Sequence, residues 1–297
     1  MPACSMGPSG DRLGWGNMNQ HGFDITRRRL LGSLAAGSLQ LVAQARPAAA
    51  AETQLTRAQK REFLLKAKIV KTRAASEGIT GTIRATLDDG NVIHDASIQV
   101  IDDSKIRFAS ATGTEINFRD SWKFNVAAYK LDQLLGLNMV PVTVERSFRG
   151  STGSYTWWVD DVLMDEGDRL KRKQQAPDVD NWNHQMHIVR VFDQLIFNTD
   201  RNLGNLLIDR NWQIWMIDHS RSCRTLTGLR EPKNLVHCDK ELLAKLKELN
   251  AETLNKALGR YLGGMEIRGL LARRDRIVKA FEEKGPSALY TSPRRPD

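Results

Sequence analysis

The feature that most constrains the fold is a polar loop that joins a core helix to a short apolar hairpin. Residues 181–198 carry apolar side chains on one helical stripe and run directly into TDRNLGN, which predicts a buried helix followed by a loop. NLLID and QIWMID then form two short strands separated by a polar turn. Because a hairpin returns the chain on itself, Asn205 at its start and Asp218 at its end should lie side by side, with Asp200 on the loop before them.

These residue types fit the requirements of phosphoryl transfer, which needs a carboxylate near the attacking hydroxyl and oxygen ligands for Mg²⁺. We expect Asp200 to face the acceptor and Asn205 and Asp218 to hold the metal. Arg201 and Arg221 are candidates to neutralise phosphate charge. Each residue alone is explained as well by a turn or a helix end, but the three in register favour the functional interpretation.

The loop resembles that of the protein-kinase-like superfamily, particularly its lipid-kinase and HipA-like branches, in which DR-x-x-x-N precedes a strand that ends in Asp. The stretch NFRDSWKFNVAAYKLDQLLGLNMVPVTVER also resembles the first-lobe helix and strand of bacterial members, so the likeness covers about residues 80–225. It implies an α+β, bilobal fold, with a small antiparallel sheet in the N-lobe and a mainly helical C-lobe. It also implies ATP and Mg²⁺ as cofactors, with Asp200 as the catalytic carboxylate and Asn205 and Asp218 as metal ligands. His219 takes the place of the family's Phe, although we expect it to be a packing residue.

Two positions depart from the family pattern. Where the superfamily has a strand Lys paired with a helix Glu, the alignment places Gln99 and Asn125. Both are neutral amides, so they can still hydrogen-bond to each other beside the nucleotide. They supply no positive charge to bind the nucleotide phosphates, as the Lys of the family pattern does. Gly78–Gly81 is a weak candidate for a Gly-rich loop.

Domain boundaries follow from the resemblance and from composition. Local patterns predict a helix over 55–68, a hairpin over 81–102, a helix from Asp120 or Ser121 to Gly136, a hairpin over 140–161, and helices over 239–262 and 264–283. We assign 52–163 to the N-lobe, 164–180 to a polar hinge or linker, 181–285 to the C-lobe and 286–297 to a disordered tail.

Residues 1–51 resemble a twin-arginine signal peptide. Arg27 and Arg28 precede a weakly apolar run and then small residues suited to cleavage near Ala50 or Ala51. The apolar run of about 15 residues is shorter than the roughly 20 that cross a bilayer, so we expect no permanent membrane span. The prediction is a periplasmic or secreted protein.

Charge and cysteine content limit the partners. The chain has 44 Lys and Arg against 35 Asp and Glu, intermixed along the sequence, which favours a solvated surface over nucleic-acid binding. Cys223 and Cys238 form either a disulfide or a buried free pair. We expect a monomer whose partners are a nucleotide and an acceptor that is a protein, a lipid or a small molecule.

Three functions are compatible with these residues. The first is a Mg²⁺- and ATP-dependent phosphotransferase that acts on a hydroxyl outside the cytoplasm. The second is a pseudokinase that binds nucleotide or partners without turnover, which the Gln99 and Asn125 changes favour. The third is nucleotidyl transfer by the same three residues.

Overall fold

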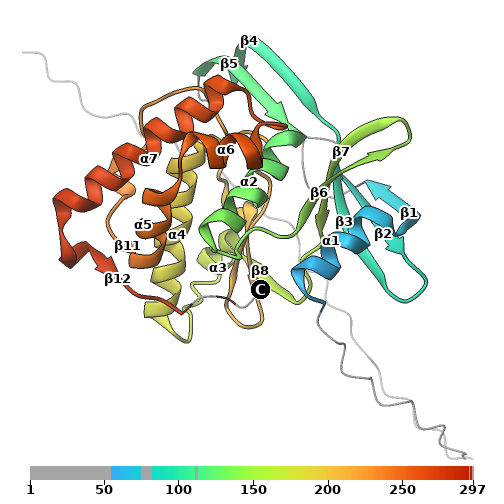
Figure 1. The fold of residues 1–297 in the computed structure, drawn as a ribbon. Helices are drawn as coiled ribbons and strands as arrows, with labels where there is room; N and C mark the ends of the chain where they lie inside the picture. The colour runs from blue at the N-terminus through green and yellow to red at the C-terminus, as the bar shows by residue number, and fades with distance from the viewer. Residues whose placement is uncertain (1–54, 75–81, 111–112, 294, 296–297) are drawn as a thin grey trace, which may run out of the picture. The chain divides into compact units, whose positions relative to one another are not determined.

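A five-stranded antiparallel sheet is built from strands that lie between residues 68 and 157, in the order β1-β2-β3-β7-β6 (Figure 1). The structure is a computed structural model that describes residues 55–74, 82–110, 113–293 and 295, which belong to one compact unit, Thr53–Asp297. The leader predicted for residues 1–51 and the Gly78–Gly81 turn lie outside the described residues. The strands of this sheet are β1 Lys68–Ala74, β2 Ile83–Asp88, β3 Ile93–Gln99, β6 Thr143–Phe148 and β7 Ser151–Trp157.

Both predicted hairpins are confirmed, and they pack edge to edge in one sheet. β2 and β3 join through a turn in which Gly90 has φ 91° and its N–H donates to the Asp88 carboxylate at 2.7 Å. β6 and β7 form the second hairpin, and β7 pairs with β3. The alternation of apolar and polar residues was therefore sufficient to predict this part of the sheet.

Two helices pack with this sheet. α2 (Trp122–Leu135) begins at Ser121, whose hydroxyl caps the helix, and ends at Gly136 with φ 64°, as the sequence predicted. α1 (Arg57–Lys66) has a capping box formed by Thr56 and Gln59 and buries Phe63 and Leu64. It ends before residue 68, because Lys68 already belongs to β1.

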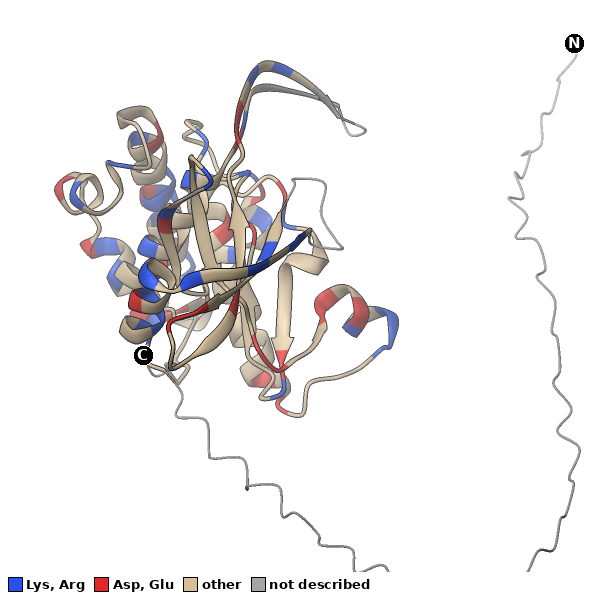
Figure 2. Cartoon of the chain, turned by 90° about the vertical axis from the view of Figure 1, so that its right-hand side faces the viewer, with Lys and Arg blue, Asp and Glu red and all other residues tan. Residues whose placement is uncertain are grey.

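A hairpin between β3 and α2 was not predicted. β4 (Asp102–Ser110) and β5 (Gly113–Ser121) pair only with each other among the described residues and project from the rest of the unit (Figures 1 and 2). Ile106 on β4 is 81% exposed, so the strand lacks the one-sided burial that produces a readable alternating pattern.

The second half of the chain is mainly helical. α4 (Val179–Ile196) is the predicted core helix, and β9 and β10 form the predicted hairpin. The predicted helix over 239–262 is two helices, because the Asn250 side chain accepts a hydrogen bond from Thr253 N and starts a new helix. The elements are β9 Leu206–Asp209, β10 Ile214–Met216, β11 Cys238–Asp239, α5 Lys240–Glu248, α6 Ala251–Leu258, α7 Gly264–Lys284 and β12 Leu289–Tyr290, with short 3-10 turns at Pro232–Asn234 and Pro286–Ala288.

Two segments expected to be irregular are ordered. Residues 164–180 contain the end of β8 (Val162–Asp165), which pairs with β9, and the helix α3 (Glu166–Lys171). The prediction of a disordered tail is wrong for residues 286–293 and 295. β12 pairs in parallel with β11, and the guanidinium of Arg295 donates to the Gln185 side chain at 2.7 Å. Pro-rich composition gives no sign of these tertiary partners.

Several composition-based expectations can be compared with the structure. Cys223 and Cys238 are both buried, and among the described residues Cys223 forms no disulfide, so the prediction of a Cys223–Cys238 disulfide is wrong. Basic and acidic residues intermix over the helices and strands (Figure 2). Among the described residues, no helix has both the length and the apolar character needed to cross a bilayer.

Candidate functional site

The loop after α4 brings Asn205 and the segment before Asp218 into direct contact. A 3-10 turn, Leu203–Asn205, leads into β9, and β10 returns antiparallel to it. The backbone N–H of Ile217 donates to the Asn205 carbonyl at 3.1 Å, and the Asn205 side-chain amide donates to the Asp200 carbonyl at 3.3 Å. The structure therefore gathers the three predicted residues on one loop and hairpin.

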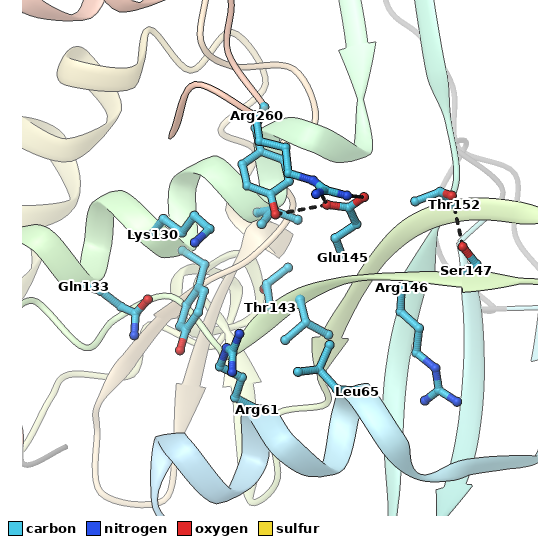
Figure 3. Close-up of a pocket in the computed structure, with 14 residues that line it drawn as sticks. Arg61, Leu65, Lys130, Gln133, Thr143, Glu145, Arg146, Ser147, Thr152 and Arg260 are labelled. Carbon is cyan, nitrogen blue, oxygen red and sulfur yellow. Dashed lines mark hydrogen bonds and ion pairs between the residues drawn. The ribbon is translucent and has the colours of Figure 1, made fainter. Parts of the chain in front are cut away.

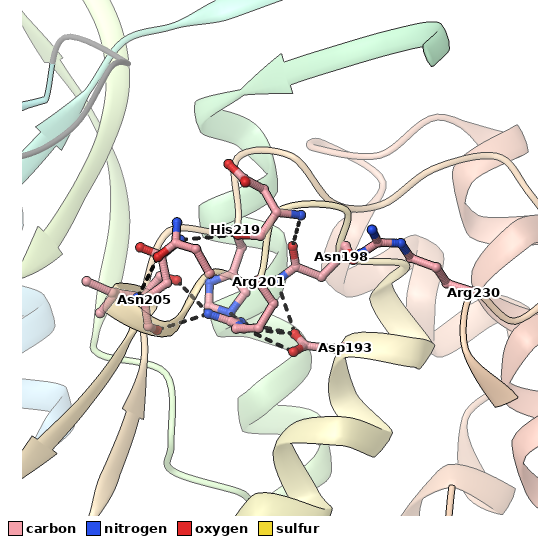
Figure 4. Close-up of polar contacts among 9 residues, drawn as sticks. Asp193, Asn198, Arg201, Asn205, His219 and Arg230 are labelled. Atoms are coloured by element: carbon pink, nitrogen blue, oxygen red, sulfur yellow. Dashed lines mark hydrogen bonds and ion pairs between the residues drawn. The ribbon is translucent and has the colours of Figure 1, made fainter. Parts of the chain in front are cut away.

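Arg201 holds this arrangement together from inside the loop (Figure 4). Its guanidinium contacts both carboxylate oxygens of Asp193 on α4 at 3.0 Å each. It also donates to the carbonyls of Asn205 at 3.0 Å and Ile217 at 2.9 Å, and contacts the His219 ring at 3.1 Å. An arginine has five N–H groups, and these contacts use all of them.

The prediction that Arg201 binds phosphate is therefore wrong. Its side chain is 12% exposed and every N–H donor has a partner inside the protein. The sequence places Arg201 next to Asp200, but proximity along the chain says nothing about the direction of the side chain. The residue instead links the ends of the hairpin, which keeps Asn205 and the residues around Asp218 together.

His219 is a buried packing residue, as expected. Its ring packs edge-on against Phe192, and burial together with the neighbouring Arg201 charge lowers the pKa of His219 well below its usual value. The neutral ring can therefore accept the hydrogen bond from Arg201. The backbone N–H of His219 donates to the Asn125 side chain at 2.8 Å, which connects this segment to α2.

Gln99 and Asn125 face each other, as the alignment of the first half of the chain requires. The Asn125 amide donates to the Gln99 side-chain oxygen at 2.5 Å, and each residue is only 6% exposed. Gln99 in turn donates to the Thr82 hydroxyl at 3.0 Å. The two amides thus form a neutral bridge from β3 through α2 to His219, and their role toward a nucleotide stays a prediction.

Arg221 lies among carboxylates, and its side chain is 25% exposed against 12% for Arg201. Its Nε donates to Asp120 at 2.9 Å, and its Nη1 lies 3.4 Å from the Asp200 carboxylate. Burial opposes the charge, but the hydrogen bond with Asp120 and the charges of Asp120, Asp200 and Asp218 raise the pKa of Arg221 overall. The contacts with Asp120 and Asp200 therefore place this cation beside the candidate site.

Asp120 is a functional candidate that sequence reasoning missed, since it appeared there only as a possible helix cap. It lies on β5 directly before the α2 cap and is 1% exposed; its buried carboxylate oxygen Oδ1 has no hydrogen-bond partner among the described residues. The next residue reinforces the contact, because the N–H of Ser121 donates to the Ser220 carbonyl at 2.9 Å. No pattern connects Asp120 to Arg221, which lies 101 residues further along the chain.

The environment of Asp200 favours the protonated form of the acid. Burial raises the pKa of Asp200; the Arg221 charge opposes this shift, and the charges of Asp218 and Asp120 reinforce it. A carboxylate with a raised pKa is a stronger base than one at the ordinary value. The surroundings of Asp200 therefore strengthen it as a proton acceptor.

Asn205 and Asp218 fit a hard divalent cation in their chemistry. Both present side-chain oxygens, the ligand type that Mg²⁺ prefers, and Mg²⁺ is commonly held by one or two protein ligands together with substrate phosphates and water. Within the described ranges, no three His, Cys, Asp or Glu side chains are grouped to hold a metal. The residues present thus fit a cation that a bound nucleotide helps to hold, rather than a closed protein cage.

Comparisons with protein-family models and with curated proteins find no match, whereas solved structures show the same fold. The structure of hydra Fam20 with sugar has a TM-score of 0.58 at 16% identity and covers 79% of this chain and 92% of that chain. A Golgi casein kinase with Mn/ADP bound has a TM-score of 0.55 at 11% identity, covering 79% of this chain and 78% of that one. A second structure of the Golgi casein kinase has a TM-score of 0.53 at 12% identity. The chain therefore has the protein-kinase-like fold that the sequence resemblance implied.

Proposed function

We propose that this chain is a kinase-like phosphotransferase that binds ATP with a divalent cation, such as Mg²⁺, and transfers a phosphoryl group to a hydroxyl. The observation that carries the proposal is the loop clamped by Arg201, which gathers Asp200, Asn205 and the Asp218 segment on a protein-kinase-like fold. Mn/ADP in the Golgi casein kinase structure supports the class of cofactor.

Each residue has a distinct task in this proposal. Asp200 orients the acceptor hydroxyl and takes its proton, which its raised pKa favours. Asn205 and Asp218 would hold the cation through their side-chain oxygens. When bound, ATP would supply the phosphoryl group, and the cation would supply positive charge against that of the phosphates. Arg221, anchored by Asp120, adds a fixed positive charge beside the site.

Metal-dependent nucleotide binding tests the assignment first. We expect Asp218→Asn to lose Mg²⁺-dependent ATP binding by at least about tenfold, because a carboxylate ligand is replaced by a neutral amide. Asp161→Asn is the matched control, since that carboxylate is 76% exposed and pairs only loosely with Arg210. The proposal fails if both variants bind ATP and Mg²⁺ as the parent chain does.

A pseudokinase is the second candidate, and the neutral Gln99–Asn125 bridge is the observation that favours it. ATP labelled separately at the α- and γ-phosphates distinguishes the possibilities. Transfer of the γ-label to an acceptor panel of proteins, lipids and small hydroxyl compounds supports a phosphotransferase, whereas transfer of the α-label indicates nucleotidyl transfer. Nucleotide binding without transfer of either label identifies a pseudokinase.

We also propose that the protein is exported by the twin-arginine route to the periplasm or the medium. The support is the order of Arg27, Arg28, the weakly apolar run and the small residues in the sequence. Replacing both arginines with Lys should leave precursor in the cytoplasm. Normal processing of that double variant would exclude this route.

A further inference from the structure

A cavity of about 460 Å³ lies along strand β6, between α1, α2 and the segment after α6 (Figure 3). None of its lining residues belongs to the candidate phosphotransfer site. Leu65, Val126 and Val144 supply apolar surface, and consecutive residues of β6, 143–147, supply one wall. The cavity thus follows the edge of the sheet rather than the candidate site.

The cavity carries excess positive charge. Its charged lining residues are Arg61, Lys130, Arg146, Arg260 and a single carboxylate, Glu145. Glu145 is already bound by Arg260 through two hydrogen bonds, at 2.6 and 2.7 Å, and by the Tyr261 hydroxyl at 3.1 Å. The one acid in the cavity is therefore fully occupied and does not neutralise the other cations.

Two of these cations are available to a ligand. Arg146 is committed to the Leu64 carbonyl at 2.8 Å. Arg61 on α1 and Lys130 on α2 extend toward the same space (Figure 3), and in the described part of the chain neither forms a hydrogen bond or an ion pair. An anionic group placed between them would gain two charge-assisted contacts.

Strand β6 also has one edge that pairs with no other strand in the described part of the chain. Among the described residues it pairs only with β7, through a two-residue turn in which Arg149 has φ 49° and Gly150 has φ 82°. In a hairpin with a two-residue turn, the two residues that flank the turn exchange backbone hydrogen bonds with each other. Counting from that pair, every second residue of β6 therefore forms its backbone hydrogen bonds with β7. The hydrogen bond from Trp157 N to the Val142 carbonyl fits this alternation. The backbone groups of residues 143, 145 and 147 therefore face away from β7. Thr143 is buried, whereas Glu145 and Ser147 are partly or fully exposed and line the cavity.

We propose that this cavity binds an extended acidic segment of a partner protein, which pairs with the free edge of β6 and places carboxylates or phosphates at Arg61 and Lys130. An added strand satisfies the backbone groups at this edge, and side chains at alternate positions fill the pocket beside it. The chain's own residues 1–51 do not suit the site, because they contain five Arg and two acids. This inference does not depend on phosphotransfer, since it concerns binding alone.

The test uses the full-length protein and a fluorescein-labelled peptide of four Glu-Val repeats, measured by fluorescence polarisation. We expect saturable binding that weakens with salt, and no binding of the matching Lys-Val peptide. Arg61→Glu and Lys130→Glu should each weaken binding by about five- to tenfold, because each change removes one exposed ion pair with the peptide and puts a negative charge in its place that repels the peptide. Lys279→Glu on α7, a lysine that is 76% exposed and outside the cavity, should have no effect.

Peptides with methylated backbone nitrogens separate strand pairing from simple charge attraction. In an added strand, every second backbone N–H group faces β6. One peptide is therefore methylated at the backbone nitrogens of all its Glu residues, and a second at those of all its Val residues. One of the two should lose binding, and the other should bind as the unmethylated peptide does. The proposal would be overturned if both methylated peptides bound equally well. It would also be overturned if Lys279→Glu weakened peptide binding as much as Arg61→Glu and Lys130→Glu do. So would a stable dimer in light scattering that Lys130→Glu dissociates, because β6 would then be occupied by a second copy.

Discussion

The Arg201 guanidinium is the main tertiary link in the candidate loop, and its removal gives the sharpest stability prediction. Arg201→Ala leaves Asp193, which is 13% exposed, without its cation and leaves the carbonyls of Asn205 and Ile217 without a donor. Breaking a buried ion pair by removing one partner costs about 3–5 kcal/mol. Because domains are typically stable by about 5–15 kcal/mol, we expect this single change to remove a large part of the stability.

Arg201→Lys provides the graded comparison. Lysine keeps the charge beside Asp193 but has three donors and no planar fork, so it cannot reproduce all five contacts. At about 0.5–1.5 kcal/mol for each lost hydrogen bond, we expect a loss of about 1–3 kcal/mol.

Urea unfolding followed by tryptophan fluorescence measures both losses on the full-length chain. Arg210→Ala is the control, because Arg210 is 74% exposed and lies 3.5 Å from an equally exposed Asp161; it should cost less than about 1 kcal/mol. An Arg201→Ala loss no larger than that of the control would refute the assignment of Arg201 as the residue that holds the loop. A Lys variant as unstable as the Ala variant would show that the planar fork, and not the charge, dominates.

Three further predictions concern the candidate site and a buried acid. Gln99→Lys with Asn125→Glu should tighten ATP binding by more than the two single changes together, because each charge alone lacks its partner; additive effects would show that the pair is not coupled. Asp120→Asn should move the acid limb of the pH–rate profile to lower pH, because the Asp120 charge helps to raise the pKa of Asp200; an upward shift would contradict this assignment. Burial raises the pKa of Asp132 to about 6 against the opposing Arg57 charge, so the folded state retains a proton that the unfolded chain releases between about pH 4 and 6. We therefore compare the unfolding free energy of the parent chain with that of Asp132→Asn. The difference between the two should fall by about 1–3 kcal/mol from pH 4 to pH 7, and a difference that does not change with pH would refute the raised pKa of Asp132.

Local sequence signals were enough to predict most of the elements around the site. The hydroxyl cap at Ser121 and the left-handed Gly136 delimit α2 because these residues satisfy or permit helix ends by themselves. The two hairpins of the main sheet follow from alternation and from short turns such as that at Gly90. Spacing alone also placed Asn205 next to the Asp218 segment, because a two-strand hairpin leaves the chain little choice of path.

Only the tertiary structure decided which partner each charged side chain takes. Arg201 turns toward Asp193 and two backbone carbonyls, whereas Arg221 meets Asp120 from the other half of the chain. Arg295, in a segment whose composition suggested disorder, binds Gln185 on α4. A guanidinium can pair with any acid or carbonyl within reach of its long side chain, so its choice depends on the path of distant segments. Helix caps and hairpin turns involve residues within a few positions of one another, and this is why the sequence determined those but not the ion pairs.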